Sequence, residues 1–185
     1  MKFHQNGYSI YILTGLIFFI GIGSTVFHIV PNYYTELMDI IFIVAFINLY
    51  FLSVLRRIAY LSWFQTIIVF LAFLGTTNFI VDRFPHALND SIGYLSSMLA
   101  LCFVSFYLKI RKRPSAKYYV YAAFVGIISL SFRIIDNKIC DDFALGSHFM
   151  WHSLNALLIY IVMKMLIRSV NRRARMLRMA AEYGL

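Results

Sequence analysis

Long apolar runs, separated by short polar or charged segments, make up most of the chain. A helix needs about 20 mostly apolar residues to cross the hydrocarbon core of a bilayer. Six runs approach that length, with approximate bounds 8–29, 37–55, 60–81, 92–110, 118–135 and 149–167. Short connections favour neighbouring helices that run up and down. The pattern therefore predicts an all-α transmembrane helix bundle with six spans, forming a single domain over residues 1–185.

The composition excludes an ordinary soluble domain. Hydrophobic residues make up 61% of the chain and charged residues only 14%, against about 45–50% and 25% in soluble domains. The net charge of +9 would suit nucleic acid, but the basic residues lie between and after the apolar runs. We therefore expect no nucleic acid, and anionic lipid head groups as partners of the basic loops and of the tail over 168–185. That tail is expected to continue the last helix along the lipid surface.

Charged residues segregate between the two sides of the predicted bundle. The side that holds both termini carries most of the Lys and Arg, including those at 56–57, 109–113 and in the tail. The opposite side carries most of the acidic residues. By the positive-inside rule, both termini are expected in the cytoplasm.

Five polar residues stand out where apolar runs begin or end. Ser24 and His28 lie one helical turn apart near the end of the first run. Asp39 is expected to open the second run, after the loop PNYYTEL, and His148 and His152 lie one turn apart at the start of the sixth. In the predicted topology these ends lie on the non-cytoplasmic side, so all five residues reach a similar depth.

Three histidines at one depth are the ligand set of a catalytic zinc ion, which takes three protein ligands and keeps a fourth position open. We therefore expect His28, His148 and His152 to bind zinc (Zn2+). Asp39 would carry a proton between water and a leaving group, and Ser24 would hydrogen-bond the water or an oxyanion. A haem with two histidine ligands is the main alternative. It would not explain the third histidine, the serine and the aspartate.

The ordered motifs GIGSTVFH (21–28), Asp39 and SHFMWHSLNALLIY (147–160) resemble those of the alkaline ceramidases and their bacterial relatives. These enzymes belong to a superfamily of membrane hydrolases that includes the adiponectin-receptor-like proteins. Segments 89–95 and 132–140 also look like the bacterial branch. The resemblance implies a zinc-dependent amidase of a bacterial inner membrane, which cleaves ceramide-like lipids to a long-chain base and a fatty acid. It assigns zinc to the same three histidines, and catalysis to Asp39 and Ser24.

Three further residues are candidates for support of the site. Arg133 and Asp136 match family positions near it, and Asn155 lies one turn beyond His152. Taken alone, Arg133 and Asp136 suggest a charge pair at the end of the fifth span.

The chain also departs from the family pattern. It begins just before what would be the second of seven family helices, so we expect the seven-helix fold lacking its first helix, either because that helix is lost or because the chain start is truncated. The segment that binds calcium in the eukaryotic members precedes that helix, so calcium is not expected. The alternative to an enzyme is a non-catalytic lipid-binding or receptor-like membrane protein with a structural metal site.

Overall fold

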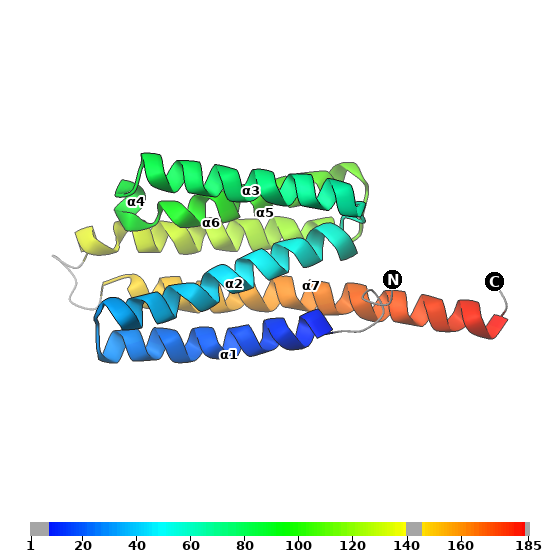
Figure 1. Ribbon diagram of the computed structural model, residues 1–185, viewed down its shortest axis with the longest axis horizontal. Helices are drawn as coiled ribbons and strands as arrows, with labels where there is room; N and C mark the ends of the chain where they lie inside the picture. The colour runs from blue at the N-terminus through cyan, green and yellow to red at the C-terminus, as the bar shows by residue number, and fades with distance from the viewer. Residues whose placement is uncertain (1–7, 140–145, 184–185) are drawn as a thin grey trace. The chain divides into compact units, whose positions relative to one another are not determined.

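The computed structural model describes residues 8–139 and 146–183, and all regular structure in them is helical (Figure 1). Six of the described helices are long and apolar enough to cross a membrane. The predicted all-α fold with six spans is therefore confirmed, and the chain is an integral membrane protein. The helices are α1 (Tyr8–Ile29), α2 (Tyr33–Arg57), α3 (Trp63–Arg83), α4 (Ala87–Asp90), α5 (Ile92–Ile110), α6 (Ala116–Ile139) and α7 (His148–Tyr183).

The ends of the helices follow the hydropathy pattern closely, but not everywhere. Helices α1 and α5 have the predicted bounds, and most of the other ends differ by up to four residues. Helix α7 is the large exception, because it runs on to Tyr183 as one helix of 36 residues. The expected continuation of the last helix into the basic tail is confirmed.

Helix α2 begins earlier than predicted because Asn32 caps it. The Asn32 side chain accepts hydrogen bonds from the backbone N–H groups of Tyr34 and Thr35, and the Thr35 hydroxyl accepts one from the Asn32 N–H at 3.0 Å. This reciprocal capping box satisfies N–H groups that the first turn of a helix leaves without partners. The expectation that Asp39 opens the second span after a loop is therefore wrong, since Asp39 lies about two turns inside α2.

The chain divides into two compact units, of which the first comprises Met1–Ser62 and Leu166–Leu185. In this unit α1 packs along α2 (Figure 1). The two backbones approach each other closely at Gly23, where an added Cβ would lie 3.0 Å from the Met38 carbonyl oxygen and 3.2 Å from the Asp39 Cα. A glycine at this position therefore lets the helices approach, as small residues commonly do in membranes.

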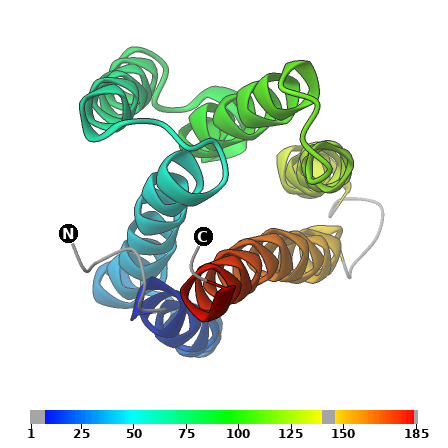
Figure 2. The same ribbon diagram turned by 90° about the vertical axis from the view of Figure 1, so that its right-hand side faces the viewer.

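The second unit comprises Trp63–Met165. Helix α5 lies between α3 and α6 and contacts both (Figure 2). Within α6, Gly126 makes room for the side chains of Met98 from α5 and Leu158 from α7. The buried hydroxyl of Ser129 in α6 donates a hydrogen bond to the backbone oxygen of Trp151 in α7, at 3.0 Å. These contacts fix the rotation of α6 and α7, and with it the direction of the polar side chains at their ends.

Candidate metal centre

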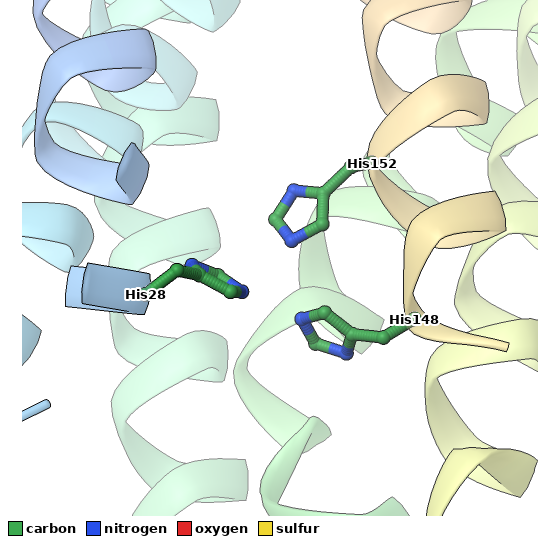
Figure 3. A group of neighbouring side chains, drawn as sticks. All are labelled: His28, His148 and His152. Carbon is green, nitrogen blue, oxygen red and sulfur yellow. The ribbon is translucent and has the colours of Figure 1, made fainter. Parts of the chain in front are cut away.

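His148 and His152 form the part of the candidate site that belongs to the second unit. They occupy the first two turns of α7, and both rings lie on one side of that helix (Figure 3). Their ring centroids are 4.7 Å apart, with 70° between the ring planes. The one-turn spacing seen in the sequence therefore brings two imidazoles together, as expected.

Asp136 of α6 holds the beginning of α7. Its Oδ1 accepts hydrogen bonds from the backbone N–H of Ser147 at 2.6 Å and from the Ser147 hydroxyl at 3.2 Å. Its Oδ2 lies 3.4 Å from Nδ1 of His148. One carboxylate therefore anchors the first turn of the helix and orients the first histidine ring.

The same contact decides which nitrogen of His148 faces a ligand. A carboxylate oxygen only accepts hydrogen bonds, so this contact favours the tautomer in which Nδ1 carries the hydrogen and Nε2 the lone pair. Histidines that bind metals usually donate their other N–H to a carboxylate or a carbonyl, which fixes the ring and raises its basicity. Asp136 therefore contacts His148, one of the residues that the sequence predicts as metal ligands.

Ser147 was not predicted as part of the site. Its buried hydroxyl shares its one hydrogen between the Phe132 carbonyl, at 2.7 Å, and Asp136, at 3.2 Å. It thereby ties the first turn of α7 to α6 in two places. A serine before a helix is a common cap, and that pattern was the available signal.

Arg133 lies against aromatic rings of the same unit. Its guanidinium carbon is 5.6 Å from the ring centroid of Tyr94 and 5.5 Å from that of Trp151, within the range of cation–π attraction. The two rings also meet edge to face, with centroids 5.0 Å apart. The sequence suggested a charge pair between Arg133 and Asp136, whereas the contacts described for the Arg133 guanidinium are with these two rings.

The contact described for Asn155 is with α6. Its Oδ1 accepts a hydrogen bond from the Ser129 hydroxyl at 3.3 Å. That hydroxyl also bonds the backbone of Trp151, the residue before His152. Asn155 therefore belongs to the α6–α7 packing one turn away from the candidate ligands.

The two segments that resemble the bacterial branch, 89–95 and 132–140, meet through side-chain amides. Asn89 donates from Nδ2 to the Arg133 carbonyl at 3.2 Å, and its Oδ1 accepts from Asn137 at 2.6 Å. Asn89 adopts a positive φ of 55°, a conformation that asparagine tolerates better than most residues. These bonds attach α4 to the end of α6 that carries Asp136.

Ser24 and His28 form the part of the candidate site that belongs to α1, in the first unit. Nδ1 of His28 donates to the Ser24 carbonyl oxygen at 2.8 Å. Because a carbonyl oxygen only accepts, Nδ1 carries the hydrogen here as well, and Nε2 carries the lone pair. His28 therefore has the same tautomer as His148, obtained from a backbone group instead of a carboxylate.

Asp39 lies beside the same turn of α1. Its Cα is 3.2 Å from the position that a Cβ on Gly23 would take, so α2 brings it to the level of Ser24. The Asp39 side chain is partly buried. The glycine before Ser24 was part of the quoted motif, but its role in bringing α1 and α2 together was not predicted.

The described donor set suits a metal that prefers nitrogen ligands. Imidazole suits zinc, copper, iron and nickel, and three imidazoles with an open fourth position are typical of catalytic zinc. Comparison of the chain with protein-family models, with curated proteins and with solved structures finds no match. The resemblance to the alkaline ceramidases therefore rests on the sequence motifs.

Proposed function

We propose that the chain is a zinc-dependent intramembrane amidase, which hydrolyses the N-acyl amide bond of ceramide-like lipids to a long-chain base and a fatty acid. The observation that carries this proposal is the shared state of His28 and His148. Nδ1 of each ring faces an oxygen acceptor, the Ser24 carbonyl at 2.8 Å or the Asp136 carboxylate at 3.4 Å. Each thereby offers Nε2 to a metal, in the way that protein ligands of zinc commonly do.

His28, His148 and His152 would hold the zinc ion. We propose that each of the three rings turns one nitrogen toward the same ion. Three nitrogens bound at 2.0–2.1 Å to one tetrahedral ion lie about 3.4 Å apart.

When bound, zinc would lower the pKa of a water molecule to about 7 and polarise the amide carbonyl. The carboxylate of Asp39 would accept the proton that the water loses as its oxygen bonds to the carbonyl carbon. It would pass that proton to the nitrogen as the carbon–nitrogen bond breaks. The Ser24 hydroxyl would donate a hydrogen bond to the oxyanion that forms meanwhile. Asp136 would keep the His148 ring in place throughout.

We also propose on which side of the membrane the site lies. Basic residues gather in the connections on the side of the termini, so we place both termini in the cytoplasm. The site then lies near the opposite face of what we take to be a bacterial inner membrane. A lipid amide sits at that depth, just below its head group.

Metal content and turnover test the proposal on the full chain purified in detergent. We expect about one zinc ion per chain and release of fatty acid from a labelled N-acyl sphingoid base. His148→Ala should lose both, whereas His86→Ala should keep both. His86 is the matched control because it is an exposed histidine in a separate pair with Asp90.

The two candidate functions differ in this experiment. Stoichiometric zinc without turnover of any N-acyl lipid would favour the receptor-like alternative with a structural metal. Turnover that survives His148→Ala would remove the histidines from the mechanism.

A further inference from the structure

Helix α7 is too long to lie entirely within a membrane. Its 36 residues extend about 54 Å at 1.5 Å per residue, while the hydrocarbon core is about 30 Å thick. The part after residue 167 therefore projects beyond the core. We call residues 168–183 the α7 extension. It carries five arginines and a single acidic residue, Glu182; the arginines are Arg168, Arg172, Arg173, Arg175 and Arg178.

The α7 extension packs against the end of α2 within the first unit. The Ser169 hydroxyl donates to the carbonyl of Arg57, the last residue of α2, at 3.0 Å. Arg173 lies one turn beyond Ser169, on the same side of α7, so the Ser169 bond brings it toward Arg57, and both arginines are partly buried. The neighbouring Arg56 makes a different contact: its side chain donates a hydrogen bond to the Leu61 carbonyl in the turn after α2.

This pairing of two arginines lacks an acidic counterpart in the part of the chain that the structure describes. Neither Arg57 nor Arg173 makes an ion pair with a carboxylate there. Two guanidinium groups that repel each other favour an anion that both can reach. Guanidinium groups bind phosphate oxygens in a bidentate fashion, so a phosphate ester fits this place better than chloride.

Exposed apolar groups within a turn or two of the arginines along the chain indicate what carries the phosphate. Met176 and Met179 of the α7 extension are 48% and 51% exposed, and Tyr60, in the turn after α2, is 47% exposed. Tyrosine is enriched at the level of lipid head groups. A free anion gains nothing from such neighbours, whereas a phospholipid brings acyl chains as well as a phosphate.

We propose that Arg57 and Arg173, with the α7 extension, bind the phosphodiester of an anionic glycerophospholipid. This site lies in the first unit and uses none of the residues assigned to amide hydrolysis, so it stands whether or not the chain is an amidase. A basic tail is attracted to any anionic surface, whereas we assign the binding to two arginines from different helices.

Lipid binding by the delipidated full chain in detergent tests the site. Native mass spectrometry would measure the affinity for phosphatidylglycerol, with phosphatidylcholine and inorganic phosphate as separate arms. Arg57→Gln and Arg173→Gln should each weaken phosphatidylglycerol binding about fivefold, and together about thirtyfold, which is the contribution of one basic residue near an anionic lipid taken once and twice. The matched control is Arg111→Gln, which removes the same charge at the exposed end of α5 and should change binding less than about twofold.

A charge-preserving variant guards against loss of the fold. Arg57→Lys combined with Arg173→Lys should bind phosphatidylglycerol more tightly than the double Gln variant. The site would be refuted if Arg111→Gln weakened binding as much as Arg57→Gln. Equal binding of phosphatidylcholine would contradict the anionic head group, and occupation by inorganic phosphate at the same concentration would contradict a lipid as the source.

Discussion

Replacement of Asp136 by asparagine separates its two roles, because the two oxygens of the carboxylate have different partners. Oδ1 accepts two hydrogen bonds from Ser147, whereas Oδ2 faces Nδ1 of His148 at 3.4 Å. In Asp136→Asn, the amide oxygen keeps its place against Ser147, since both Ser147 groups are donors. The amide NH2 then faces His148, where it is a donor against a donor.

The His148 ring then has to change its tautomer. To accept from the new amide, Nδ1 has to lose its hydrogen, and in a neutral imidazole that hydrogen moves to Nε2. Nε2 is the nitrogen that we assign to the metal, so zinc has to compete with a proton. Loss of such a supporting partner commonly costs 10–100-fold in metal affinity, or about 1.4–2.7 kcal/mol. The fold should change little, because the hydrogen bonds to Ser147 remain.

Competition with a chelator of known affinity would measure zinc binding, and circular dichroism would check helicity. The matched control is Asp90→Asn, which makes the same change in a second His–Asp pair. That pair, with His86, has a distance of 3.0 Å, but its side chains are 91% and 70% exposed. The reasoning is refuted if Asp136→Asn binds zinc as tightly as the unmodified chain, or if Asp90→Asn weakens binding equally.

Three further substitutions test the packing and the chemistry. Gly23→Ala should lower the free energy of unfolding by about 1–3 kcal/mol, because its Cβ would lie 3.0 Å from the backbone of α2. Gly21→Ala is the control, since its Cβ would meet nothing within 4 Å. Unfolding in dodecyl sulfate measures both, and equal losses would contradict the importance of the close approach. Ser129→Ala removes a buried hydrogen bond between α6 and α7 and should cost about 1–2 kcal/mol, while Ser131→Ala, at an exposed hydroxyl that bonds its own helix, should cost little in the same assay. Asp39→Asn should keep zinc but lower turnover by about 10²–10⁴, and unchanged turnover would exclude Asp39 as the proton carrier.

Hydropathy predicted the spans because crossing a bilayer requires about 20 apolar residues, whatever the neighbours are. It misplaced ends where polar residues continue a helix. Tyr33 to Glu36 are helical because Asn32 caps them, and the backbone bonds of α6 run on through Arg133 and Asp136 to Ile139. A hydropathy window weighs side chains and does not see such backbone bonds.

The candidate site was predictable where it depends on spacing along one helix. His28 bonds the residue one turn before it, and His148 lies one turn before His152. Contacts between helices depend on how each helix is rotated about its axis, so they could not be predicted from spacing along one helix. Arg133 contacts the rings of Tyr94 and Trp151. Because 18% of the residues are aromatic, composition could not identify these two as its partners.

X-ray absorption at the zinc edge, on the purified full chain and on His28→Ala, tests the central claim most directly. We expect three imidazole nitrogens at about 2.0–2.1 Å from the ion, and one nitrogen fewer in His28→Ala. A coordination shell that is the same in both proteins, or one made of sulfur or of oxygen alone, would contradict the proposed site of His28, His148 and His152.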